Sequence, residues 1–143
     1  MRCLLALANE GEGATLTIPQ ISEREGISQP LAAKVLTLLR KEGLIVSTRG
    51  QTGGYALSRT PDQINLAETF KMLGGKMFED DFCDRFVGKD DICCHKGGCA
   101  LHDLYAKIQT AVDGVLAPLT LRDLMPGRDF IAVSSIESHA RRP

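Results

Sequence analysis

The sequence lacks any apolar run close to the ~20 residues that a membrane-spanning helix needs, so a helical membrane protein is excluded. Its opening residues are apolar as far as Ala8, but the run is too short for a secretory signal and no cleavage pattern follows. We therefore expect a cytoplasmic protein without membrane partners. The 143 residues allow one domain with a modest core, or a small domain with an accessory helix.

The chain also has almost no net charge. The formal value of −1 argues against a generic nucleic-acid binder. The charges are nevertheless distributed unevenly. Residues 26–60 contain five basic side chains and one acid, whereas residues 61–91 contain eight acids and four bases. This asymmetry favours one region that faces a polyanion and a second region with another task.

The first 43 residues predict a helix-turn-helix. Thr17 and Gln20 form a Thr-x-x-Gln capping box, and Gly26 is a natural left-handed end for the helix that follows. Ser28 then caps a longer helix, which Gly43 ends. A short helix, a tight turn and a longer helix form the layout of this DNA-binding motif. The predicted helices span residues 1–9, 18–25 and 28–42.

The longer helix has an apolar side and a polar, basic side. We expect the apolar side to pack on the earlier helices through Leu31, Val35, Leu38 and Leu39. The other side suits the floor of a major groove flanked by phosphates, although an ordinary solvated helix face is an equal alternative on this feature alone. The candidate DNA-contacting residues are Ser28, Gln29, Ala33, Lys34, Thr37, Arg40 and Lys41.

A predicted hairpin directly follows this helix. Residues 44–47 and 55–57 read as strands, and the turn between them is rich in glycine. Such a hairpin can be purely structural, but after a recognition helix it indicates a wing. Arg49, with Gln51 beside it, is the candidate for contact with a narrow minor groove. The predicted fold class is therefore mainly α with a small β wing, a winged helix-turn-helix followed by a long dimerisation helix.

The region after the wing contains the candidate dimerisation helix. Asn65 can cap a helix over residues 66–73, a long helix is predicted over 101–116, and a short turn over 120–125. The long helix carries an apolar seam that suits a partner helix, although burial against its own domain is an alternative. A homodimer would match a palindromic double-stranded DNA operator. The seam consists of Leu101, Leu104, Ile108, Ala111 and Val115.

Four of the five cysteines lie within 17 positions, which favours a metal or redox site over a disulfide framework. Thiolates suit both zinc and iron–sulfur clusters, and free cysteines without metal are a less favoured alternative. Only Cys94 and Cys99 approach the spacing of a structural zinc site. The cluster comprises Cys83, Cys93, Cys94 and Cys99 with His95 and His102.

Several stretches together resemble the Rrf-type family of bacterial winged-helix transcriptional regulators, which includes IscR-like and NsrR-like proteins. They are ISEREGIS at 21–28, LRKEGLI at 39–45, RGQTGGYAL at 49–57 and the spacing of the three cysteines named next. The resemblance implies an iron–sulfur cluster on Cys83, Cys93 and Cys99, with 2Fe–2S favoured over 4Fe–4S. It implies His102 as the fourth ligand, with Cys94 and His95 as less favoured substitutes.

One residue of the candidate DNA-contacting set departs from the pattern of this family. Ala33 stands where IscR-like proteins have a glutamate that helps to discriminate DNA sites, so their operator sequence does not carry over. The predicted organisation is a DNA-binding domain over 1–75, a cluster-binding loop over 76–100, a dimerisation region over 101–125 and a mobile tail over 126–143.

The predicted function is a homodimeric DNA-binding repressor that senses iron–sulfur status, redox state or nitric oxide. The same DNA-binding role with zinc or direct thiol oxidation as the sensor is the alternative. A thiol redox protein is more distant, because the chain has no Cys-x-x-Cys and no βαβ pattern. No hydrolytic constellation is present in the sequence, and we expect no enzymatic activity.

Overall fold

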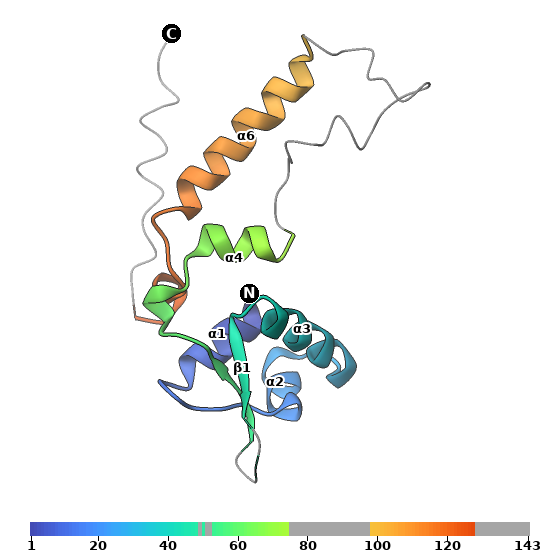
Figure 1. Ribbon diagram of the computed structural model, residues 1–143, viewed down its shortest axis with the longest axis vertical. Coiled ribbons are helices and arrows are strands. Elements are labelled where there is room, and N and C mark those ends of the chain that lie inside the picture. The colour runs from blue at the N-terminus through green and yellow to red at the C-terminus, as the bar shows by residue number, and fades with distance from the viewer. Residues whose placement is uncertain (49, 51–52, 75–97, 128–143) are drawn as a thin grey trace. The chain divides into compact units, whose positions relative to one another are not determined.

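The computed structural model describes residues 1–48, 50, 53–74 and 98–127 (Figure 1). The chain divides into two compact units. The first unit is Met1–Ile64 with Thr120–Pro143, and the second unit is Asn65–Leu119. No helix in the described ranges is both long and apolar enough to cross a bilayer.

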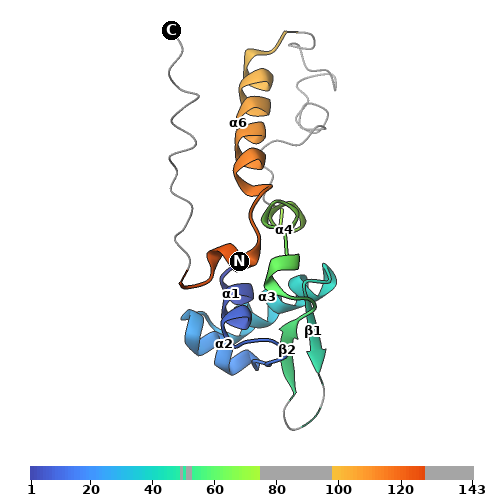
Figure 2. The ribbon, with the colours of Figure 1, turned by 90° about the vertical axis from the view of Figure 1, so that its left-hand side faces the viewer.

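Three helices form most of the first unit (Figures 1 and 2): α1 (Arg2–Asn9), α2 (Ile18–Glu25) and α3 (Gln29–Lys41). The predicted capping signals are confirmed. Thr17 and Gln20 make both hydrogen bonds of the capping box at the start of α2, and Ser28 accepts a hydrogen bond from the Leu31 N–H at the start of α3. Gly26 ends α2 with φ at +62°, a left-handed conformation that glycine adopts without strain.

The predicted packing side of α3 is wrong in part. Leu39 is buried and Val35 is half-buried, but Leu31 and Leu38 are 48% and 41% exposed. The core row is instead Ala32, Leu36 and Leu39, which all have zero exposure. Eight of the thirteen residues of this helix are apolar, so its periodicity fits two neighbouring packing sides. The turn after Gly26 and the contacts of α3 with α1 and α2 decide which of these two sides is buried.

The wing is an antiparallel hairpin of β1 (Ile45–Thr48) and β2 (Gly54–Leu57), as predicted to within one residue. A backbone bridge ties it to the segment before α2, because Leu16 and Tyr55 exchange two hydrogen bonds of 2.9 and 2.8 Å. Gly54 is required at this crossing, since a Cβ there would lie 2.8 Å from the Leu16 carbonyl oxygen. The hairpin therefore has a fixed attachment to the helices.

Two short 3-10 helices complete the first unit. The helix η3 (Leu121–Leu124) corresponds to the turn predicted at 120–125, whereas η1 (Pro61–Gln63) was not predicted. They contact each other, and the Leu121 N–H donates to the Ile64 carbonyl at 2.8 Å. The Leu121 side chain is fully buried, so a residue from late in the chain completes the core of the N-terminal helices.

The second unit contains α4 (Leu66–Met72) and α6 (Ala100–Leu116), which contact each other. Asn65 caps α4 by accepting from the Glu68 N–H at 3.1 Å, as predicted. Its Nδ2 donates to the Ala117 carbonyl at 2.9 Å, next to the end of α6. One side chain therefore holds both the start of α4 and the end of α6. The predicted functional divisions of the chain stay predictions.

Candidate nucleic-acid interface and metal ligands

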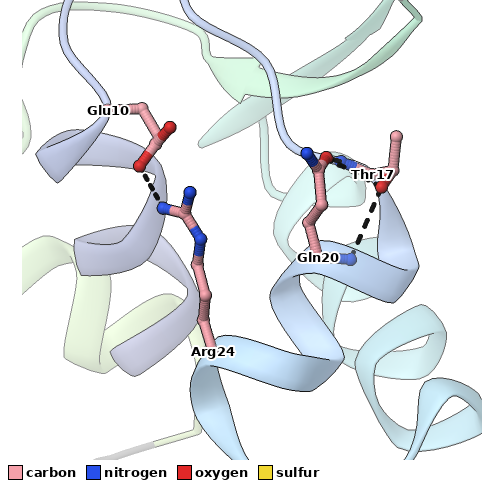
Figure 3. A network of polar contacts seen from close by, with 4 residues as sticks. All are labelled: Glu10, Thr17, Gln20 and Arg24. Atoms are coloured by element: carbon pink, nitrogen blue, oxygen red, sulfur yellow. Dashed lines mark hydrogen bonds and ion pairs between the residues drawn. The ribbon is translucent and has the colours of Figure 1, made fainter.

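The helix-turn-helix is positioned by polar contacts between α1 and α2. Arg2 pairs with the Glu25 carboxylate at 2.7 Å and donates to its carbonyl at 2.9 Å. Glu10, just after α1, pairs with Arg24 of α2, close to the Thr17–Gln20 capping box (Figure 3). This hydrogen bond from Arg24 holds the pKa of the Glu10 carboxyl below its ordinary value. The Glu10–Arg24 pair is partly exposed and contributes little stability, whereas the Glu25 side chain of the other pair is only 14% exposed. Together the pairs tie both ends of α1 to the last turn of α2.

The outward face of α3 is basic. Lys34, Arg40 and Lys41 are all exposed, and the thirteen residues of this helix include no acid. Two of the cations lie in the last turn, where they also complement the helix dipole. Gln29 and Thr37 are exposed as well, while Ala33 is half-buried. The candidate residues of this helix therefore share a surface that attracts polyanions.

Sequence reasoning missed two features of this surface. Pro30 is exposed in the first turn of α3, although the DNA-contacting residues predicted from sequence do not include it. Leu31 and Leu38 are exposed on the flank, where they had been assigned to the core. The signal for Pro30 was its spacing of seven from Thr37, which places both on one side of a helix. No signal within α3 alone would have placed the two leucines.

The wing follows directly from α3. Arg49 and Gln51 lie outside the described residues, so their placement stays a prediction. At the base of the turn, the Gly54 N–H donates to Thr48 Oγ1 at 3.2 Å. A Cβ on Gly53 would lie 2.7 Å from the Thr48 carbonyl oxygen, so glycine is sterically required there. The base of the hairpin and the basic helix belong to the same unit, and β1 contacts α3.

The structure places two of the predicted metal ligands together. Cys99 is the N-cap residue of α6 and half-buried, and His102 lies three residues later, on the first turn. The His102 imidazole is about half exposed, with Nδ1 at 3.5 Å from the Asp103 carboxylate. The described residues contain no group of three or more potential ligands. The other candidates, Cys83, Cys93, Cys94 and His95, lie outside the described residues.

The fifth cysteine is separate from these ligands. Cys3 is 5% exposed within α1, and burial raises the pKa of its thiol above the ordinary value. A neutral, enclosed thiol is a poor nucleophile and a poor metal ligand. Cys3 therefore acts as a small apolar core residue.

The predicted dimer seam is exposed within the single chain. No residue of Ala100–Leu116 is buried, although the structure describes all of them. Leu101, Leu104 and Val115 are 62%, 50% and 44% exposed, Ala111 is also exposed, and Ile108 is half-buried. A different side of α6 faces α4 through Gln109, Val112 and Leu116, where the two helices line a shallow hollow of about 280 Å³.

A larger hollow of about 1010 Å³ lies in the first unit, between the loop after α1, the segment from Leu57 to Gln63, and η3. Its charged lining residues carry both signs: Glu12, Asp62, Asp123, Arg59 and Arg122. No predicted site residue lines it, and its mixed charge selects no ligand class.

Comparison with known proteins identifies the relatives of this fold. Residues 1–127 match the Rrf2 family, described as iron-dependent transcriptional regulators. The chain is 31% identical to the HTH-type transcriptional regulator IscR of Cronobacter sakazakii, over 98% of this chain and 84% of that protein. It is 30% identical to the regulator NsrR of Bacillus licheniformis, over 92% and 90% of the two chains.

Among solved structures, the chain is similar to CymR, the global cysteine regulator of B. subtilis. The TM-score is 0.67 at 27% identity, and the match covers 90% of this chain and 91% of that one. The predicted fold class is thereby confirmed, because the described helices and hairpin match a family of winged-helix regulators. The relatives are transcriptional regulators by name, which confirms the prediction that the chain is not an enzyme.

Proposed function

The chain belongs to the Rrf2 family of helix-turn-helix transcriptional regulators, and we propose that it represses transcription as a homodimer on a palindromic operator. The observation that carries this proposal is the basic outward face of α3, which has three exposed cations and no acid and is followed at once by a hairpin. Phosphate contacts would supply affinity and position the helix, while base contacts would supply specificity.

The proposed DNA-binding residues fall into two classes. Arg40 and Lys41 supply contacts to phosphate, and Arg49 and Gln51 of the wing supply contacts to the minor groove and its rim. The N-cap and one outward side of α3 supply contacts to base edges in the major groove. The residues of the second class are Ser28, Gln29, Ala33, Lys34 and Thr37.

The exposed seam of α6 supports the homodimer. Large apolar side chains at half exposure on successive turns are unfavourable in water, and pairing with the same helix of a second copy would bury them. A two-fold pair would present two copies of α3 to successive major grooves. The seam therefore links oligomerisation to operator recognition.

The cysteine-rich segment supports an iron–sulfur sensor, with 2Fe–2S favoured. Cys99 and His102 fit a cluster chemically, because a thiolate and an imidazole lie on one turn of α6 with both side chains accessible. Cys83 and Cys93 would complete the ligand set. Such a cluster, when bound, supplies reversible electron transfer and sensitivity to oxidants and nitric oxide. Cys99 lies at one end of the dimer helix, so loss of a ligand would be transmitted to the pairing of subunits.

DNA binding is tested by selecting operator fragments from genomic DNA with the full chain, followed by titration at several salt concentrations. Arg40→Ala and Lys41→Ala should weaken binding and each reduce the slope of log K against log salt by about 1. Lys107→Ala, which removes an exposed cation from α6, is the matched control and should leave both quantities unchanged. Equal effects of all three variants would contradict the assignment of α3.

The cluster is tested by an absorption spectrum of protein purified without oxygen, with iron, sulfide and zinc measured on the same sample. We expect visible charge-transfer bands with matching iron and sulfide, and loss of both in Cys99→Ser. Cys3→Ser is the matched control and should retain the spectrum, because that thiol lies in the core. A colourless protein that stays iron-free after reconstitution would overturn the cluster and favour zinc or direct thiol oxidation.

The dimer is tested by sedimentation equilibrium. Leu104→Asp places a charge in the seam and should convert the dimer to a monomer, with a parallel loss of operator affinity. Thr110→Asp introduces the same carboxylate at an exposed position on the side of α6 away from the seam and should leave the dimer intact. A wild-type protein that is monomeric at micromolar concentration on DNA and off it would overturn this part of the proposal.

A further inference from the structure

The outward face of α3 has an apolar strip where a DNA-reading helix would place polar groups. Pro30 and Thr37 are exposed, and Ala33 is half-buried. Their spacings of three and four residues put them on one side of the helix, away from the buried row of Ala32 and Leu36. Pro30 and Ala33 have no polar side-chain atom that could bond a base edge.

Thr37 joins this strip because its hydroxyl is already engaged. Thr37 Oγ1 donates to the Ala33 carbonyl at 2.8 Å, one turn back along the helix. The hydroxyl proton is therefore unavailable to an acceptor on a base, while the γ-methyl group remains as the apolar part of an exposed side chain. Sequence alone counts Thr37 as a hydrogen-bond donor, whereas this bond occupies its single donor and leaves the hydroxyl oxygen as an acceptor and the methyl group as the apolar contact.

The charges beside the strip indicate what it would meet. Lys34 and Lys41 adjoin it on one side and Arg40 on the other, and all three are exposed. An apolar strip between cations matches a major groove, in which phosphates lie at both edges and the thymine C5-methyl is the apolar feature of the floor. Alanine and the threonine methyl are side-chain groups of the size that contacts this methyl.

We propose that α3 recognises thymine C5-methyl groups through Pro30, Ala33 and Thr37, so that its operator is selected by methyl contact at these positions. This inference rests on the proposed DNA-binding function and adds the chemistry of its specificity. The flanking lysines and Arg40 provide attraction that does not depend on sequence. Among these three residues, Thr37 is the specificity-determining residue that is easiest to test, because conservative substitutions remove its methyl group and its hydroxyl group separately.

The first test uses the selected operator with each thymine in turn replaced by deoxyuridine, which removes the methyl group and leaves every hydrogen-bonding atom in place. We expect a loss of affinity of about three- to fivefold at one or more thymines, as the burial of one methyl group predicts. Replacement of thymines outside the footprint of α3 should have no effect.

The second test uses two variants of Thr37. Thr37→Val keeps a methyl group and loses the hydroxyl, so it should bind the thymine operator as the wild type does and remain sensitive to deoxyuridine. Thr37→Ser keeps the hydroxyl and loses the methyl group, so it should bind both operators with the lower affinity. Thr110 in α6 also donates to the carbonyl four residues back, at 2.9 Å, and Thr110→Ser is the matched control that should change neither affinity.

The outcomes separate the inference from the function on which it rests. A chain that selects no operator refutes the proposed function, and the inference with it. A chain that binds its operator specifically but is insensitive to deoxyuridine at every thymine overturns the inference alone. Weak binding by Thr37→Val together with normal binding by Thr37→Ser would also overturn it, because the hydroxyl would then be the group that contacts DNA.

Discussion

Similar apolar side chains are buried in the first unit and exposed on the helix α6. In the first unit, each of α1, α2, α3, the wing and η3 contributes at least one leucine, isoleucine or alanine with little or no exposure, among them Leu4, Ile21, Leu36, Ile45, Ala56 and Leu121, whereas no residue of α6 is buried. Both regions have amphipathic helices with apolar residues at helical spacing. Apolar residues at helical spacing therefore predict that a helix has an apolar side. They do not predict whether that side packs against the same chain or against another chain.

The same distinction occurs within α3. Its buried row belongs to the core of the first unit, while Leu31 and Leu38 remain on the surface beside basic residues. A leucine in α3 and a leucine in α6 therefore have different physical roles at similar sequence spacing. Substitutions that exchange or remove these side chains test this difference directly.

The largest effect is expected for Leu36→Ala in the core of α3. The side chain is fully buried, so its truncation should lower the free energy of unfolding by about 2–5 kcal/mol. Leu104→Ala removes the same atoms from a half-exposed position, and its effect on stability should depend on protein concentration through the dimer. Urea denaturation at two protein concentrations measures both. If both variants lost the same free energy of unfolding at both protein concentrations, the proposed difference between the buried core and the exposed seam would be wrong.

Two glycines provide the next comparison. Gly54→Ala places a Cβ at 2.8 Å from the Leu16 carbonyl oxygen, and the overpacking should cost about 1–3 kcal/mol. Gly114→Ala in α6 meets no atom within 4 Å and should stabilise the helix by about 0.5–1 kcal/mol. Thermal unfolding of the two variants measures the sign of each change. Destabilisation by Gly114→Ala would indicate that another chain packs closely there.

A smaller effect is expected at Asn65, which holds the start of α4 and the end of α6. Asn65→Ala removes the cap and should destabilise the protein by about 1 kcal/mol. Asn65→Asp keeps an acceptor for the Glu68 N–H but loses the donor to the Ala117 carbonyl. Hydrogen exchange should therefore show protection of the first turn of α4 retained in Asn65→Asp and lost in Asn65→Ala. Identical exchange in the two variants would contradict the double role.

The smallest effect is expected for the exposed pair of Glu10 and Arg24. The pKa of Glu10 in the folded protein lies below its ordinary value of 4.5, so the stabilisation is present above that pH and is lost as the pH falls through the folded pKa. Glu10→Gln should be slightly less stable than the wild type near neutral pH and equal to it in acid. In an Arg24→Ala background the same change should have no effect at either pH.

The local structure of the first unit was predictable because its signals act over a few residues. A capping box, a left-handed glycine and an N-cap serine each require only backbone groups within one turn, and α2 and α3 begin and end where these signals predict. The cap at Asn65 is of the same kind. The residue types of the candidate site were also predictable, since cations and thiols are visible in the sequence.

The packing side of α3 was not predictable in the same way. Leu31 and Leu38 are as apolar as Leu36, and only the contacts with α1 and α2 place Leu36 inside. The hydroxyl bond that leaves the Thr37 methyl as the apolar contact also depends on the rotamer of one side chain. Neither feature has a signal in residue type or spacing.

By itself, the sequence determined where the helices and the hairpin begin and end, which residues carry charge and thiols, and which family the chain resembles. These properties depend on local backbone chemistry and on residue identity. Only the tertiary structure decided which apolar residues are buried, how Leu121 completes a core built mainly from the N-terminal helices, and that the seam of α6 is left exposed. Burial is a property of contacts between distant segments, and a pattern along one helix does not contain them.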